Sequence, residues 1–141
     1  MMQHTGLSAY RQTEAQSRTP LELVVMLYDG ALRFLAVARD AVERKDIHAR
    51  RDAISRVLAI ISELQSTLDM DRGGTLAADL DGLYGYITRR VMDAALHNDT
   101  VPLDDARRLI ETLRDGWQTI AVPTGAATGS VVRSGPSEGA M

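Results

Sequence analysis

The stretch Thr19-Pro-Leu-Glu-Leu-Val-Val-Met-Leu-Tyr-Asp-Gly-Ala-Leu-Arg-Phe34 decides the fold of this chain. Thr19 offers a side-chain oxygen as a helix N-cap, Pro20 suits the first helical position, and Glu22 completes a capping box. We therefore predict a helix from about Pro20 to about Arg44. At roughly 100° per residue, its core stripe consists of Leu21, Val24, Val25, Tyr28, Ala31, Leu32, Leu35 and Val42.

The same helix carries a second apolar surface around Gly30, formed by Leu23, Met26, Leu27 and Phe34. A helix that is apolar on nearly all sides is central, spans a membrane or is covered by something else. Glu22, Asp29 and Arg33 interrupt the run, which argues against a membrane span. A chain of 141 residues also leaves little room for a fully central helix. We interpret the second surface as a docking surface.

Length and composition indicate one globular domain, because 141 residues with 45% hydrophobic content can bury a real core. The net charge of -3 argues against a broad nucleic-acid interface. The chain has no cysteine, which excludes disulfides and thiolate chemistry. Residues 1–19 lack the apolar run of a signal peptide, so we expect a cytoplasmic protein without membrane insertion.

Three further amphipathic segments follow the first helix. Lys45-Asp46 makes a tight connection to a second helix that ends at about Leu68. Its core positions repeat every seven residues at Ile47, Ile54, Ile61 and Leu68, with Val57 and Leu64 between them.

Gly73-Gly74 predicts a helix stop and a turn, after which Thr75 can cap a third helix that runs to about His97. Pro102 then opens a fourth helix. The core stripe of the third helix is Leu76, Leu80, Leu83, Ile87, Val91 and Ala94. The stripe of the fourth is Leu103, Ala106, Ile110, Leu113, Trp117 and Ile120.

Four amphipathic helices with short connections alternate in direction, which predicts an all-α protein, an antiparallel up-down four-helix bundle over residues 19–121. Residues 1–18 form a short N-terminal cap segment that lays Leu7 and Tyr10 onto the bundle, or else a frayed terminus. Residues 122–141 contain four glycines and two prolines without periodicity, so we expect a disordered tail.

Catalysis is the weaker hypothesis. Di-metal bundles need Glu-x-x-His pairs, and no glutamate here is followed by a histidine at that spacing. His4, His48 and His97 lie in the terminal segment or near helix ends and are expected to be solvated. Gly82-x-x-Gly85 has no preceding strand and fails as a phosphate-binding loop. We therefore predict a protein that is not an enzyme and uses neither metal nor cofactor.

Gly30, Gly82 and Gly85 lie inside predicted helices, where each costs about 1 kcal/mol relative to alanine. Close approach of helices within the bundle is one possible reason. Room for the backbone of a partner on the outside is the other, and both interpretations stay open at this point.

Several segments together resemble the flagellar secretion chaperone family, whose client is flagellin. They follow the order and spacing of that family over roughly residues 9–120. The matching segments are Ala9-Tyr10, Thr19 to Leu35, Ile60-Ile-Ser-Glu-Leu-Gln-Ser-Thr-Leu-Asp-Met70, Gly73-Gly74, Leu83-Tyr-Gly-Tyr-Ile-Thr-Arg-Arg90, Asn98-Asp99 and Leu113-Arg-Asp-Gly-Trp117.

The resemblance implies a cytosolic, non-enzymatic export chaperone that binds the disordered C-terminal region of flagellin. It implies that binding prevents premature polymerisation and keeps flagellin competent for type III flagellar secretion. The complex with the client would engage a component of the flagellar export gate. We expect a monomer or weak homodimer. The alternative function is a structural or regulatory helical adaptor that oligomerises through the same apolar surface.

Ordering a disordered client costs about 1–2 kcal/mol per backbone residue, so a wide interface of roughly 2,000 Å² is needed. Candidate anchors lie on the first helix and a candidate rim on the third. The client-binding candidates are Leu23, Leu27, Phe34, Tyr86 and Arg90. In the alternative interpretation the three anchors pack beneath the N-terminal segment or against the second helix. Leu7 and Tyr10 would shield part of the surface until the client arrives.

Overall fold

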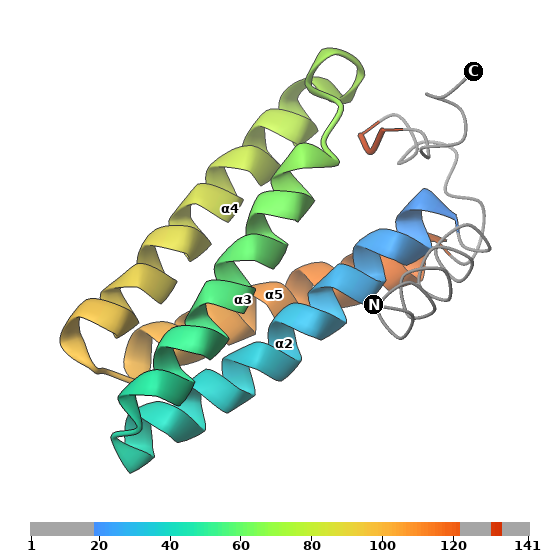
Figure 1. Cartoon of the computed structure of the whole chain (residues 1–141). Coiled ribbons are helices and arrows are strands. Elements are labelled where there is room, and N and C mark those ends of the chain that lie inside the picture. The colour runs from blue at the N-terminus through green and yellow to red at the C-terminus, as the bar shows by residue number, and fades with distance from the viewer. Residues whose placement is uncertain (1–18, 122–130, 134–141) are drawn as a thin grey trace, which may run out of the picture.

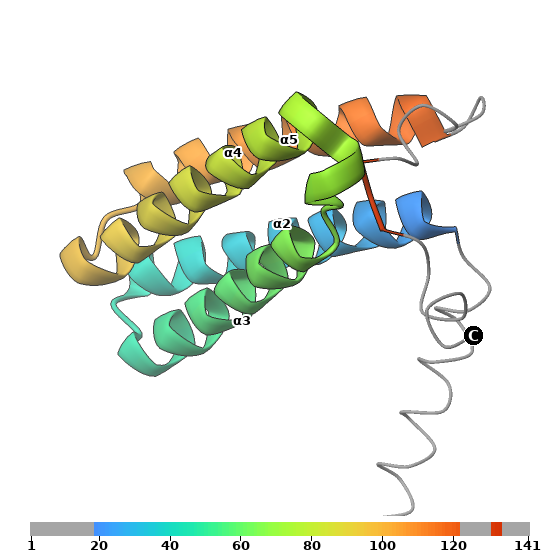
Figure 2. The same ribbon diagram turned by 90° about the horizontal axis from the view of Figure 1, so that it is seen from above.

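The computed structural model describes residues 19–121 and 131–133 (Figure 1). Within these residues the chain forms α2 (Pro20–Arg44), α3 (Ile47–Ser66), α4 (Met70–His97) and α5 (Val101–Ala121). Short connections make consecutive helices antiparallel, and each helix packs against two neighbours, α2 and α4 both contacting α3 and α5. Figure 2 shows two layers, with α2 and α3 in one and α4 and α5 in the other. The predicted up-down four-helix bundle is confirmed.

The capping box that was expected at the start of α2 is present. The Thr19 hydroxyl accepts the backbone N–H of Glu22 at 3.1 Å, and the Glu22 carboxylate accepts the N–H of Thr19 at 3.0 Å. The helix ends where Lys45 adopts a left-handed conformation with φ of 60°. Asp46 then caps α3 by accepting the N–H of Ala49 at 3.1 Å. These local signals explain why both helix boundaries agree with the prediction.

The start of α4 differs from the prediction. Asp69, rather than Thr75, is the N-cap, and its carboxylate accepts the N–H of Arg72 at 3.0 Å. Gly74 interrupts the helix with φ of 55° and ψ of -135°. Because glycine lacks a Cβ, it adopts this conformation at little cost. The predicted stop at Gly73-Gly74 is therefore a kink inside α4, preceded by one helical turn.

Two predicted core residues are on the surface. Ile47 is 55% exposed because it is the first residue of α3, at the outer end of the bundle. Leu76 is 48% exposed, directly after the kink at Gly74. The observed core stripe of α4 is rotated accordingly. It consists of Ala77, Leu80, Tyr84, Ile87, Val91 and Ala94.

Elsewhere the predicted stripes hold. On α2 the buried members are Leu21, Val24, Tyr28, Ala31, Leu35 and Val42, whereas Val25 and Leu32 are half-buried. On α5 the core residues are Leu103, Ala106, Ile110 and Trp117, with Leu113 half-buried beside them.

A tyrosine pair occupies the centre of the core. Tyr28 on α2 and Tyr84 on α4 are almost fully buried, and their hydroxyl oxygens lie 2.5 Å apart in a hydrogen bond. Burial raises the pKa of Tyr84 to about 12. Burial and the neighbouring Tyr84 raise the pKa of Tyr28 further. Both phenols are therefore neutral in the folded bundle over a wide pH range.

A disordered tail is predicted over residues 122–141, but the structure orders residues 131–133 of it. Val131 and Val132 are buried, at 3% and 5% exposure, and Val132 forms an antiparallel bridge with Leu68. The remaining tail and the cap residues Leu7 and Tyr10 lie outside the described residues.

The raised pKa of Tyr84 predicts alkaline destabilisation. In the unfolded chain this phenol ionises near its ordinary pKa of 10.0, whereas in the folded chain it ionises near 12. The folded state therefore retains the proton where the unfolded state has lost it, so stability is full below pH 10 and falls as pH rises towards 12. We expect a loss of about 2–3 kcal/mol from this residue, measured by urea unfolding at a series of pH values.

The Tyr84→Phe variant should show a smaller decrease in unfolding free energy over this range than the native chain. Ile87→Val is the matched control, because it changes a core residue of the same helix without removing an ionisable group and should lower the unfolding free energy equally at every pH. Equal pH slopes for the native chain and Tyr84→Phe would contradict the prediction.

Candidate functional site

The candidate anchors of α2 lie where α2 meets α3. Leu23, Leu27 and Phe34 are half-buried, and Leu27 and Phe34 pack against the core. Gly30 is buried between them, and a Cβ added there would lie 3.3 Å from Cδ1 of Ile60 on α3. Close approach of α2 and α3 is therefore the reason for Gly30.

Phe34 also contacts α3 through its ring. The Arg56 guanidinium carbon lies 5.4 Å from the ring centroid, a cation–π geometry, and Arg56 is held by Asp52 at 3.2 Å. Packing against the second helix, the alternative for these anchors, thus accounts for part of their burial. It does not cover the whole surface, because Met26 and Val37 beside them are 39% and 49% exposed. We call this surface the α2 apolar face, made of Leu23, Met26, Leu27, Phe34 and Val37.

The candidate rim residues lie where α4 meets α5. The Tyr86 hydroxyl donates to Oδ2 of Asp105 at 2.7 Å, and Nε of Arg90 donates to the same oxygen at 3.0 Å. The Tyr86 hydrogen bond and then Arg90 hold the pKa of the Asp105 carboxyl below its ordinary value. Tyr86 and Arg90 therefore tie α4 to α5 while the Tyr86 ring stays partly exposed.

The five candidates do not form one compact site. The structure brings Leu27 and Phe34 together in the α2–α3 layer, and Tyr86 and Arg90 together in the α4–α5 layer (Figure 2). The two groups lie on different layers of the bundle. A single partner that reaches all of them has to wrap around the molecule.

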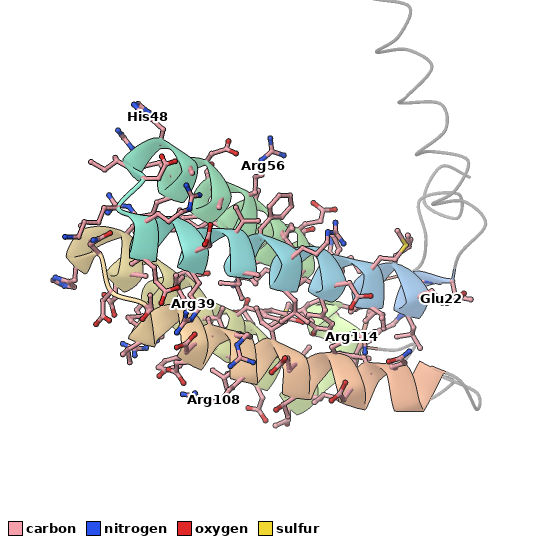
Figure 3. All side chains as sticks on the ribbon, turned by 90° about the horizontal axis from the view of Figure 1, so that it is seen from below. Glu22, Arg39, His48, Arg56, Arg108 and Arg114 are labelled. Atoms are coloured by element: carbon pink, nitrogen blue, oxygen red, sulfur yellow. The ribbon has the colours of Figure 1, made fainter. Side chains whose placement is uncertain are left out.

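The line where α2 meets α5 is polar. Arg39 on α2 pairs with Asp104 on α5 at 2.8 Å, and Arg114 on α5 pairs with Asp29 on α2. Figure 3 shows Arg39 and Arg114 along this line and Arg56 on the other side, over α3. These pairs connect the two layers.

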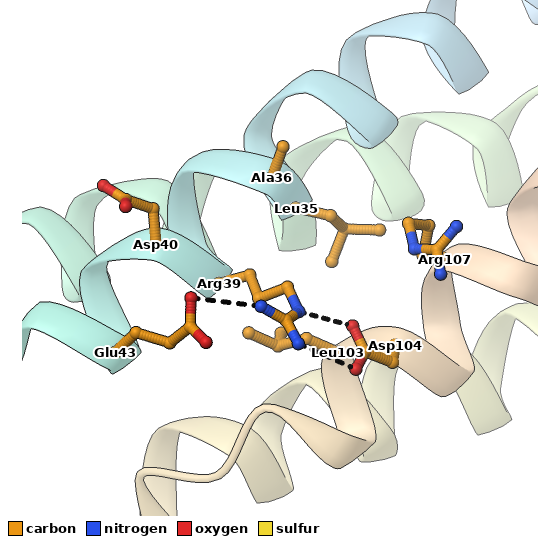
Figure 4. A pocket seen from close by; sticks show the side chains of 8 residues that line it. All are labelled: Leu35, Ala36, Arg39, Asp40, Glu43, Leu103, Asp104 and Arg107. Atoms are coloured by element: carbon orange, nitrogen blue, oxygen red, sulfur yellow. Dashed lines mark hydrogen bonds and ion pairs between the residues drawn. The ribbon is translucent and has the colours of Figure 1, made fainter.

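The Arg39 pair lies in a small pocket of about 180 Å³ between α2 and α5 (Figure 4). The Arg39 guanidinium lies between Asp104 and Glu43, at 2.8 and 3.1 Å, so its charge is already compensated by protein carboxylates. Within the described residues, no group of three or more metal-ligating side chains converges. The pocket has the features of a helix–helix contact whose charges are already paired rather than of a ligand site.

Gly82 and Gly85 on the outer side of α4 have a different environment from Gly30. An added Cβ at Gly82 would meet nothing within 4 Å, and one at Gly85 would meet only the Arg89 side chain at 3.7 Å. Close packing inside the described bundle is therefore not their reason. Room for a partner on the outside remains as the interpretation.

Sequence reasoning missed apolar residues on this side of α4. Met92 and Leu96 are 48% and 76% exposed, and they continue the helical stripe that contains Gly85. Their spacing of four residues, outside the predicted core stripe, was the signal that could have identified them.

Comparison with known proteins identifies relatives over most of the chain. The family model described as "Flagellar protein FliS" matches residues 2–124. The chain is 34% identical to "Flagellar secretion chaperone FliS" of Salmonella typhimurium, over 83% of this chain and 90% of the relative. It is 36% identical to "Flagellar secretion chaperone FliSB" of Pseudomonas aeruginosa, over 82% and 95%. It is 34% identical to the Bacillus subtilis "Flagellar secretion chaperone FliS", over 79% and 82%.

The environment of Gly82 predicts a stabilising substitution. Because an added Cβ meets no neighbour and the residue is helical, Gly82→Ala should raise the free energy of unfolding by about 1 kcal/mol, measured by urea unfolding. Gly74→Ala is the matched control, since an added Cβ there also meets nothing but φ is +55°, and it should destabilise. A loss of stability in Gly82→Ala would mean that this position is packed after all.

Proposed function

Because this chain belongs to the FliS family of flagellar secretion chaperones, we propose that its client is flagellin and that it binds the disordered C-terminal region of that subunit. None of the helices in the described part of the chain combines the length and the hydrophobicity of a membrane span. The observation that supports the proposal best is the α2 apolar face, which the core and α3 cover only in part.

An extended interface suits a disordered client. Each client residue that becomes ordered costs about 1–2 kcal/mol of backbone entropy, which a small contact cannot offset. Candidate residues on two layers let one chain bury a large area as it wraps from α2 to α4. Amphipathic client helices that lay apolar residues against such faces are the expected binding mode.

The residues have different roles in this proposal. Leu23, Leu27 and Phe34 anchor one client segment along α2. Tyr86 and Arg90 form a rim on α4 for another segment, with Asp105 holding both side chains in place. Gly82 and Gly85 would let a client backbone come close to α4. Tyr28 and Tyr84 are core residues, so their replacement would change stability and binding together.

Masking of the flagellin C-terminal region would prevent premature polymerisation in the cytoplasm and keep the subunit competent for type III secretion. The complex with the client would then engage a component of the export gate, with the chaperone acting as a monomer or weak homodimer. The rival function is a helical adaptor that oligomerises through the α2 apolar face. The exposure of Met26 and Val37 is the feature that would serve it.

The proposal predicts that full-length flagellin co-purifies with this chain and that flagellin without its C-terminal region does not. Leu23→Glu and Phe34→Ala should weaken binding to flagellin about tenfold or more, because truncating or charging an anchor costs about 2 kcal/mol. Titration calorimetry measures the affinity.

Ile47→Glu is the matched control, since it places the same charge at an exposed apolar position on another helix. Unfolding curves of each variant separate lost binding from lost stability. Equal binding of the truncated flagellin would overturn the proposal. A stable homo-oligomer that Leu23→Glu dissociates, seen by sedimentation, would favour the adaptor.

A further inference from the structure

Residues 131–133 are seated on the connection between α3 and α4. The backbone C=O of Val131 accepts the N–H of Asp69 at 2.7 Å, and the N–H of Arg133 donates to the C=O of Thr67 at 2.7 Å. These bonds flank the antiparallel bridge between Leu68 and Val132. The Arg133 side chain adds a bond from Nε to the C=O of Leu68 at 3.0 Å. The segment therefore binds as a short added strand.

The two valines complete the core at this end of the bundle. Val131 and Val132 belong to the same buried cluster as Leu21, Leu68 and Trp117. Figures 1 and 2 show the segment beside the α3–α4 connection, at the end where α2 begins and α5 finishes. Without these valines, the apolar side chains at this end would lie open to water.

The connection accepts an extended chain because of its backbone. Helix ends leave C=O and N–H groups without partners inside the helix, and an interruption between two helices places both kinds together. Asp69 uses its carboxylate to cap α4, which leaves its N–H for the added strand. The Arg133 guanidinium lies at the carbonyl end of α3, where the helix dipole favours a cation. Strand addition of this kind gains affinity from main-chain hydrogen bonds, so it does not depend on one unique sequence.

The seat lies at the end of the bundle where the α2 apolar face begins. Figures 1 and 2 show residues 131–133 at the end where α2 starts, and Leu23, the first residue of the face, is in the first turn of α2. A client that runs along this face towards the start of α2 therefore ends near the seat. The contact made by the tail is small, two valines and three backbone or side-chain hydrogen bonds, so another extended segment can exchange with it.

We propose that residues 131–133 are an intramolecular competitor, which fills a peptide-binding seat at Thr67–Asp69 until an extended apolar segment of the client replaces it. The proposal rests on the proposed chaperone function. It assigns to the tail a regulatory role, because the apparent client affinity is lowered by the fraction of chains whose seat is open.

Two variants of the full chain test the competition. Val131→Asp/Val132→Asp should release the tail, since two carboxylates are not tolerated in the buried cluster. Leu68→Cys/Val132→Cys should lock it, since directly opposed residues of an antiparallel pair place their Cβ atoms close enough for a disulfide. The chain has no cysteine of its own, so the oxidised product is unambiguous.

The purified C-terminal region of flagellin is titrated into each chain by calorimetry. We expect the released variant to bind about tenfold more tightly than the native chain, as for a seat that is closed about nine-tenths of the time. The oxidised cysteine variant should bind more than tenfold more weakly than the same chain after reduction, because a locked seat is almost never open. Ser137→Asp/Ala140→Asp is the matched control, because it adds the same charge to the tail beyond residues 131–133, and its affinity should equal that of the native chain.

A labelled peptide of residues 129–135 tests the seat without flagellin. It should bind the released variant and not the oxidised one, and a peptide with aspartate at both valine positions should bind neither. Equal flagellin affinity in the native, released and locked chains would overturn the competition while the proposed function stands. If no chain binds flagellin, the proposed function fails, and binding of the peptide alone then decides whether the seat exists.

Discussion

Helix α2 has two apolar sides that must both be kept from water, and the arrangement of the bundle depends on how each side is covered. One side supplies the largest share of the core through residues such as Tyr28 and Leu35. The opposite side meets α3, which approaches closely at Gly30 because no side chain stands between α2 and Ile60 there. A helix with so much apolar surface can be buried only in part by its two neighbours, α3 and α5. The excess surface is what remains for recognition.

The polar contacts between helices set alignment more than stability. The pairs Arg39–Asp104 and Arg90–Asp105 are partly exposed, and such pairs contribute about 0–1 kcal/mol each. Their geometry nevertheless fixes how α5 lies against α2 and α4, because Asp104 pairs with Arg39 on α2 and Asp105 accepts from Tyr86 and Arg90 on α4. Burial of aliphatic side chains supplies most of the stabilisation. The bundle can thus keep the α2 apolar face partly exposed while charged pairs align α5 with α2 and α4.

The helices could be predicted because their signals come from neighbouring residues. Contacts between distant residues could not be predicted, because they depend on the three-dimensional arrangement. The capping box at Thr19 and the apolar period of α2 are properties of neighbouring residues, so the helix and its ends followed from the sequence. The side of α4 that turns inward depends on the kink at Gly74, so the apolar period predicts Leu76 in the core, whereas the structure exposes Leu76 and buries Tyr84. The contact of Val131 and Val132 has no period at all and involves residues far apart in the chain. Tyr86 and Arg90, four residues apart, are predicted as a rim on one side of the third helix, but their shared partner Asp105 is visible only in three dimensions.

The Tyr28–Tyr84 hydrogen bond joins helices at opposite corners of the bundle, since α2 and α4 each pack mainly on α3 and α5. If α2 and α4 slid or moved apart, two phenol oxygens would be left without a hydrogen-bond partner in an apolar interior, at a cost of about 1–3 kcal/mol for each. The hydrogen bond therefore resists separation of α2 from α4. A polypeptide that binds the bundle meets a rigid surface, so the conformational change on binding occurs in that polypeptide.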